Sequence, residues 1–269
     1  MINNKFFNII PKQRIKSALY IFSFFIISII WLKYIYYILI IVLCILSYFE
    51  WKNMIMQNNF GINLMLNLVN KFNNKNIIEN LFSNNSNKVK NIQQENEISK
   101  DKKMFFILIM PAFLCLIFLR SKYEYIYTLI FFFHIWMVDI FAMLSGKIIG
   151  GYKLAPKISP NKTISGFICG IVTSSFVIAY FIINILKLNN LNFNIFNFDL
   201  NQNYILFILF CYFGILNQLG DLICSSYKRK YNIKDFSNII PGHGGILDRF
   251  DSIILSAPIY LYIIYNLNI

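Results

Sequence analysis

Seven apolar runs, each close to the length of a membrane-spanning helix, limit more than any other feature how this chain can fold. A helix of about 20 residues crosses the hydrocarbon core of a bilayer, and 57% of this chain is hydrophobic with a mean hydropathy of +0.56. The runs lie at residues 17–32, 34–50, 104–119, 124–144, 164–187, 203–220 and 252–266. They predict an all-α, polytopic integral membrane protein with about seven transmembrane helices.

The distribution of basic residues predicts how these helices are oriented. Cytoplasmic loops retain Lys and Arg, and short translocated loops do not. With the N-terminus inside, only four of the 25 basic residues fall on the outer side, namely Lys33, Arg120, Lys122 and Lys187. We therefore expect a protein integral to the cell (inner) membrane, with its N-terminus and its basic loops in the cytoplasm and its C-terminus outside.

The net charge of +13 is explained first by this topology. The chain has no basic helix or interleaved folded module of the kinds that read nucleic acid, so we expect no nucleic-acid partner. Basic loops of this kind are attracted instead to anionic membrane lipids. The five cysteines have no metal-ligand spacing and lie mostly in apolar runs, which predicts neither a disulfide nor a cysteine-bound metal.

Composition divides the chain into three parts. Residues 1–50 hold a basic segment and two membrane helices, and residues 104–269 hold five more helices. Between them, residues 51–103 are rich in Asn and Lys and predict a polar cytosolic insertion. Apolar residues recur at helical spacing in residues 60–72. This stretch fits a helix lying in the membrane interface or a helix packed on other cytosolic loops.

A second polar feature is the loop 145–163, which contains three glycines, two prolines and four lysines. We expect neither helix nor strand over most of its length. It is either an anion-binding loop or a flexible basic loop. Asp139 lies inside the preceding apolar run near its cytoplasmic end, so we expect it beside this loop. A carboxylate there indicates function, and solvation at the interface is the alternative.

The third and most informative polar segment lies between the last two apolar runs. Asp221 ends the sixth run, and Asp248 and Asp251 begin the seventh at a spacing that shares one helix face. Three carboxylates at one membrane surface are suitable ligands for Mg²⁺, although an acidic helix start alone would explain Asp248 or Asp251. The basic residues that could hold phosphate oxygens are Lys228, Arg229, Lys234 and Arg249.

A turn at residues 241–245 completes this segment. Gly242, Gly244 and Gly245 lack a β-carbon and allow a ligand to approach the backbone closely. His243 is either a hydrogen-bond donor to a phosphate or a donor that stabilises the turn, and we do not expect it to bind a metal.

The order of these residues resembles the signature of the phosphatidate cytidylyltransferase (CDP-diacylglycerol synthase) family. The matching positions are Ser225, Lys228, Arg229, Lys234, Asp235, Ser237, Pro241, His243, Gly244, Gly245, Asp248, Arg249 and Asp251. An upstream element of the family is matched by Asp139, Ala142, Gly146 and Lys147. Glu50 and Trp51 resemble its N-terminal region briefly. Tyr227, Met143 and Ser165 depart from the family pattern.

The resemblance implies an enzyme of phospholipid biosynthesis with catalytic loops on the cytoplasmic face. Such an enzyme transfers CMP from CTP to phosphatidic acid, and it releases CDP-diacylglycerol and pyrophosphate. We expect Mg²⁺ as cofactor, with a second cation left open, and Asp221, Asp248 and Asp251 as its ligands. The expected catalytic residues are Asp221, Lys228, Asp248 and Asp251. The expected substrate-binding residues are Lys147, Lys162, Ser225, Arg229, Lys234, His243, Gly244, Gly245 and Arg249.

Two other functions fit parts of the sequence. A CTP-dependent polyprenol or phytol kinase would also combine nucleotide loops with membrane helices, but it would release CDP. A membrane transporter would use Asp139 and the polar loops as a pathway, although the chain has no convincing internal repeat of the kind common in transporters. The sequence leaves a homodimer open.

Overall fold

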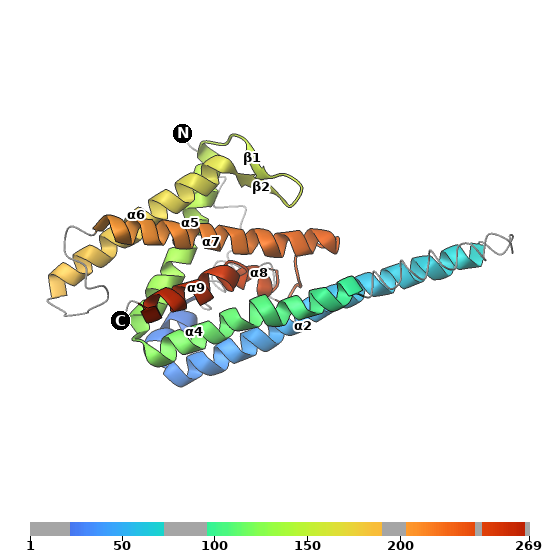
Figure 1. Cartoon of the computed structure of the whole chain (residues 1–269), viewed down its shortest axis with the longest axis horizontal. Helices are drawn as coiled ribbons and strands as arrows, with labels where there is room; N and C mark the ends of the chain where they lie inside the picture. Colours follow the sequence, from blue (N-terminus) through green and yellow to red (C-terminus); the bar gives the residue numbers. More distant parts are fainter. Residues whose placement is uncertain (1–21, 73–95, 190–202, 240–243, 267–269) are drawn as a thin grey trace.

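A computed structural model describes residues 22–72, 96–189, 203–239 and 244–266, and almost all of them are helical (Figure 1). The labelled helices are α2 (Lys33–Phe72), η1 (Phe105–Ile109), α4 (Met110–Lys122), α5 (Tyr125–Ile148), α6 (Ile164–Asn189), α7 (Asn203–Lys230), α8 (Leu247–Phe250) and α9 (Ile253–Asn266). The hairpin of β1 (Lys153–Ala155) and β2 (Ser159–Thr163) is the one sheet in the described ranges. The prediction of an all-α protein is confirmed.

Five helices in these ranges are long and apolar enough to cross a membrane. They span residues 33–56, 96–122, 125–148, 164–182 and 204–230. The predicted run 17–32 lies partly outside the described residues and forms a helix at 22–30. The run 252–266 forms α9, which has only 14 residues. The chain is therefore a polytopic membrane protein, and its described residues include five helices long enough to span the membrane and these two shorter apolar helices.

The outward faces of the long helices carry large apolar side chains. Ile38, Ile41 and Ile45 of α2 are exposed, as are Val172 and Phe176 of α6. Their spacing of three and four residues places each set on one side of its helix. In a bilayer these faces contact lipid chains, which explains why apolar surface of this extent remains uncovered by protein.

α2 is longer than the apolar run that predicts it. It continues without interruption from Lys33 to Phe72 and projects beyond the other helices (Figure 1). Residues 60–72 are helical as predicted, but they continue α2 and do not form a separate helix. The helix that runs antiparallel to α2 begins at residue 96, passes through the π-helical turn η1 and continues as α4. The expected boundaries at 50 and 103 thus fall inside helices, and the three-part division of the chain stays a prediction.

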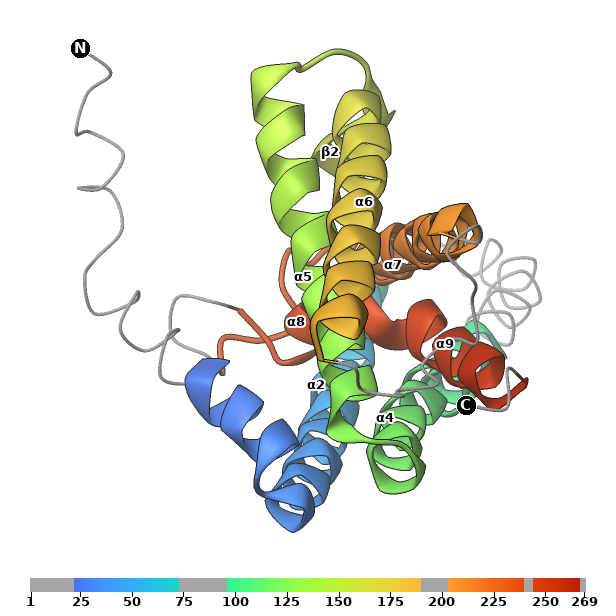
Figure 2. The ribbon, with the colours of Figure 1, turned by 90° about the vertical axis from the view of Figure 1, so that its left-hand side faces the viewer.

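Small residues allow α5 and α6 to pack side by side (Figure 2). A β-carbon added at Gly170 would lie 2.6 Å from the β-carbon of Ala142 on α5. One added at Gly166 would lie 2.6 Å from the carbonyl oxygen of Ala142 and 3.2 Å from the α-carbon of Gly146. Close helix contacts in membranes use such small residues. This contact fixes the start of α6, and with it the end of β2, against α5.

The expectation that residues 145–163 lack regular structure over most of their length is wrong. α5 continues to Ile148, and β1 pairs antiparallel with β2, with Lys153 opposite Thr163. Gly150 and Gly151 have φ angles of +67° and +96°, which glycine adopts readily and which turn the chain from α5 into the hairpin. The many glycines and prolines therefore mark the ends of short elements.

Candidate active site

The site begins on α7, which extends ten residues beyond the apolar run that predicts it. Asp221, Ser225 and Lys228 follow one another at intervals of four and three residues on this helix, so they share one face. The Ser225 hydroxyl donates a hydrogen bond of 3.1 Å to Asp221 Oδ1. These three residues are thus held by a rigid helix, although we expected all but Asp221 in a loop.

Asp221 is joined to the hairpin by an ion pair. Lys162 Nζ on β2 lies 2.6 Å from Asp221 Oδ2 and also donates to Gln218 Oε1 at 2.9 Å. Gln218 Nε2 in turn donates to Asp139 Oδ1 at 3.1 Å. This confirms that Asp139 lies close to the 145–163 segment, to which Gln218 joins it. It also shows that Lys162 belongs with the α7 carboxylate, which supports its place at the site.

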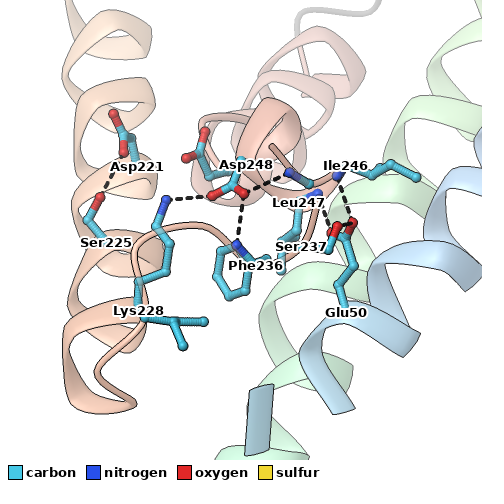
Figure 3. A network of polar contacts seen from close by, with 12 residues as sticks. Glu50, Asp221, Ser225, Lys228, Phe236, Ser237, Ile246, Leu247 and Asp248 are labelled. Atoms are coloured by element: carbon cyan, nitrogen blue, oxygen red, sulfur yellow. Dashed lines mark hydrogen bonds and ion pairs between the residues drawn. The ribbon is translucent and has the colours of Figure 1, made fainter. Parts of the chain in front are cut away.

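Asp248, on the short helix α8, contacts Lys228 of α7 (Figure 3). Lys228 Nζ donates to Asp248 Oδ1 at 2.7 Å, and both side chains are nearly buried, with 10% and 8% exposed. The second oxygen, Oδ2, accepts hydrogen bonds from the backbone amides of Phe236 at 2.9 Å and Gly245 at 3.0 Å. One carboxylate thereby joins α7 to the two ends of the 236–245 segment.

Asp251 is buried beside α7 because Gly220 leaves room for it. A β-carbon at Gly220 would lie 2.8 Å from the Asp251 carbonyl oxygen and 3.1 Å from that of Ser252. Burial raises the pKa of the Asp251 carboxyl, and the nearby Asp221 carboxylate raises it further, while Lys228 acts in the opposite direction. A buried carboxylate facing another carboxylate would be stabilised by a cation between them.

The donor set suits a hard cation such as Mg²⁺, which takes carboxylate oxygens and leaves other positions for water and phosphate. Asp251, which is buried and lies near the Asp221 carboxylate, and Asp221 itself are the two carboxylates best suited to this role. In the part of the chain that the structure describes, no three acidic, histidine or cysteine side chains are close enough to hold one ion. The oxygens of Asp248 already accept three hydrogen bonds. A role for Asp248 as a third ligand therefore stays a prediction.

The other predicted residues differ in their contacts and exposure. Arg229 is exposed and donates to the carbonyl oxygens of Ile158 at 3.1 Å and Ile233 at 3.0 Å, so it ties α7 to the hairpin turn. Gly244 has a φ of +83° and Gly245 is buried. Lys147, Lys234 and Arg249 are exposed as well. His243 lies outside the described residues.

Glu50 and Gln218 contribute to the network although we predict no role for them from sequence. Glu50 is only 1% exposed, and its carboxylate accepts hydrogen bonds from the amides of Ile246 and Leu247 and from the Ser237 hydroxyl (Figure 3). An acidic residue at the end of an apolar run was the available signal for Glu50. Gln218 stands within an apolar run beside Asn217 with no comparable signal.

The site lies near one membrane surface. Lys33, at the start of α2, donates to Ser121 at the end of α4, and seventeen residues of helix separate Lys33 from Glu50. That is about 25 Å along the axis, against about 30 Å for the hydrocarbon core. The polar network is therefore close to the membrane face opposite Lys33.

Comparison with known proteins agrees with this chemistry. A model of the cytidylyltransferase family matches residues 12–267. A phosphatidate cytidylyltransferase of Rickettsia bellii is 36% identical over 257 residues, which cover 93% of this chain and 89% of that protein. The enzyme of the same name from Rickettsia prowazekii is 34% identical over 252 residues, or 93% of this chain and 90% of its own.

A phosphatidate cytidylyltransferase of Staphylococcus haemolyticus is 41% identical over a shorter stretch of 136 residues, which is 49% of this chain and 46% of that protein. The family match thus includes both the C-terminal segment with the buried aspartates and the N-terminal helices that carry Glu50. The chain belongs to the cytidylyltransferase family.

Proposed function

We propose that this protein transfers CMP from CTP to phosphatidic acid, giving CDP-diacylglycerol and pyrophosphate. The observation that carries the proposal is the pairing of two carboxylates on α7 and α8 with two lysines, Lys162 with Asp221 and Lys228 with Asp248. In this reaction a phosphate oxygen of the lipid attacks the α-phosphorus of CTP, and the bond to pyrophosphate breaks. Both reactants are anions, so positioned cations are needed to bring them together.

Lys162 is the cation best placed to meet a substrate phosphate. Its side chain is 22% exposed and that of Asp221 is 24% exposed, so the pair is open enough to exchange partners when an anion enters. Lys228 and Asp248 are more deeply buried. Lys228 thus keeps a fixed position, from which its charge stabilises pyrophosphate as it leaves.

Asp221 and Asp251 would hold Mg²⁺. When bound, the cation neutralises phosphate oxygens and supports the charge that moves onto pyrophosphate. Until substrate and cation arrive, Lys162 balances the Asp221 charge, and Asp251 is buried away from water. Ser225 orients Asp221 by donating to its Oδ1.

The distribution of basic residues supports a cytoplasmic location for the site. The hairpin and the end of α7 carry Lys153, Lys157, Arg229 and Lys230, and an excess of such residues is typical of the cytoplasmic side. We place the N-terminus and the site on that side, where CTP is available. A homodimer stays a prediction.

The proposal is tested by the products of the purified protein in lipid vesicles. With CTP and phosphatidic acid we expect pyrophosphate and CDP-diacylglycerol in equal amounts, only when Mg²⁺ is present. Release of CDP with phosphorylation of a polyprenol would instead indicate a lipid kinase. Movement of an ion across the vesicle membrane without any turnover of CTP would indicate a transporter.

A further inference from the structure

We propose that Glu50, on the N-terminal helix α2, is a positioning residue for the active site that acts through Asp248. The inference rests on the proposed function. Glu50 is separated by nearly two hundred residues from the segment it contacts, and no described contact joins it to Asp221, Lys162 or Lys228. Its role is therefore to hold the protein groups that place the reacting charges.

Glu50 is a buried carboxylate whose partners are all hydrogen-bond donors of one segment. Its Oε1 accepts from the Ile246 amide at 2.8 Å and from the Ser237 hydroxyl, and its Oε2 accepts from the Leu247 amide at 2.8 Å. The four ion pairs among the described residues do not include Glu50. A buried carboxylate without a cation is expensive unless such donors surround it, so these contacts must be well fixed.

The groups that Glu50 holds are the immediate neighbours of the groups that hold Asp248. Ser237 follows Phe236, whose amide donates to Asp248 Oδ2. Ile246 follows Gly245, whose amide donates to the same oxygen. Figure 3 shows the two carboxylates on opposite sides of this short stretch of backbone. A shift of Glu50 therefore moves both amides that orient Asp248.

Packing leaves little freedom for this arrangement to relax. A β-carbon at Gly245 would lie 2.9 Å from both carboxylate oxygens of Glu50. Trp51, the next residue of α2, stacks on Phe236 at 6.0 Å and packs against Tyr227 of α7 at 4.9 Å between ring centroids. The indole N–H of Trp51 donates to the Asp101 carbonyl oxygen at 2.9 Å, which anchors the ring.

The functional consequence concerns Lys228. Its ammonium is held by Asp248 at 2.7 Å and lies 5.2 Å from the Phe236 ring centre. If Glu50 no longer fixes the 236–247 segment, Asp248 and Phe236 both gain freedom and Lys228 loses its defined place. A displaced Lys228 stabilises the charge that develops in the transition state less well, so kcat falls. The binding of CTP, at Lys162, is largely kept.

The test compares Glu50→Gln with the matched control Glu97→Gln in the purified full-length protein. Gln has the shape of Glu but points N–H groups toward amide donors. We expect kcat to fall about 10-fold to 100-fold, with KM for CTP changed less than about twofold. Glu97 is 67% exposed and pairs only loosely with Lys230 at 3.5 Å, so its variant should match wild type. Ser237→Ala, which removes one donor, should give a smaller loss of kcat.

A second readout separates positioning from general instability. Hydrogen exchange of the 244–250 segment should accelerate in Glu50→Gln, while exchange in α5 and α6 stays as in wild type. The proposal is overturned if kcat is unchanged, if KM alone rises, or if exchange accelerates equally throughout. Failure of wild type to make CDP-diacylglycerol would instead refute the proposed function, so the two failures are distinguishable.

Discussion

Replacing Gly220 with Ala tests how α7 is fitted to the site. The new β-carbon would lie 2.8 Å from the carbonyl oxygen of Asp251 and 3.1 Å from that of Ser252. A carbon and a carbonyl oxygen in ordinary contact are about 3.4 Å apart. Because both obstacles are backbone atoms, no side chain can rotate away. α7 and the turn before α9 must therefore separate by about 0.5 Å, and Asp221 moves away from Asp251.

The effect on stability is small and the effect on rate is larger. Overpacking costs about 1–3 kcal/mol, but Ala in place of Gly within a helix returns about 1 kcal/mol, which leaves a net loss of about 0–2 kcal/mol. A misplacement of 1 Å can cost about 100-fold in rate, so 0.5 Å predicts about a tenfold fall in kcat. The assay is the initial rate of CDP-diacylglycerol formation at saturating substrates, with the thermal midpoint measured on the same sample.

Gly214 on the same helix provides the matched control. The three atoms nearest to a β-carbon there would all belong to the Ile171 side chain, at 3.2 Å and beyond, and these can yield by a few tenths of an ångström. Gly214→Ala should therefore keep both kcat and the thermal midpoint close to wild type. If Gly220→Ala gives a kcat within twofold of Gly214→Ala, the close fit between α7 and Asp251 does not set the geometry of the site.

Three further results follow from the contacts of the site. Lys162→Met removes the cation beside Asp221 and should lower CMP transfer at least about 100-fold; Lys153→Met on the paired strand is the control, and equal rates for the two variants would remove Lys162 from the site. Tyr231→Phe deletes a 2.6 Å hydrogen bond to the buried Asp101 carboxylate and should cost about 1.5–3 kcal/mol of stability with kcat unchanged; an unaltered thermal midpoint would contradict this. Chelation of divalent cations should abolish transfer until Mg²⁺ is restored, and Asp251→Asn should raise the Mg²⁺ concentration for half-maximal rate at least about tenfold; activity that survives chelation would exclude the proposed cation.

The helical membrane architecture could be predicted because it depends on local sequence. Each apolar run must satisfy its own backbone hydrogen bonds in lipid, and a helix does this within one segment. The ends of the helices were less predictable. α7 continues from Asp221 to Lys230 although its last turns are polar, because a helix that leaves the membrane can continue in water.

The residues of the site could be predicted only where their order along the chain carried information. The carboxylates and lysines between Asp221 and Asp251 form a recognisable series, and the structure brings most of them together. The contact of Glu50 with Ile246 and that of Gln218 with Lys162 join distant segments, and nothing in the local sequence specifies either partner. The different roles of Asp248, which binds Lys228, and of Asp251, which is buried near Asp221, likewise depend on the break between α8 and α9.

The most direct test of the proposed chemistry uses CTP labelled at its α-phosphate, supplied with phosphatidic acid to vesicles that contain wild type or Asp221→Asn. Wild type should move the label into CDP-diacylglycerol and release one pyrophosphate for each labelled lipid. Asp221→Asn, folded to the same thermal midpoint, should transfer at least about 1,000-fold less label. Label that remains in CDP with wild type, or transfer by Asp221→Asn at a rate near wild type, would contradict cytidylyl transfer at this site.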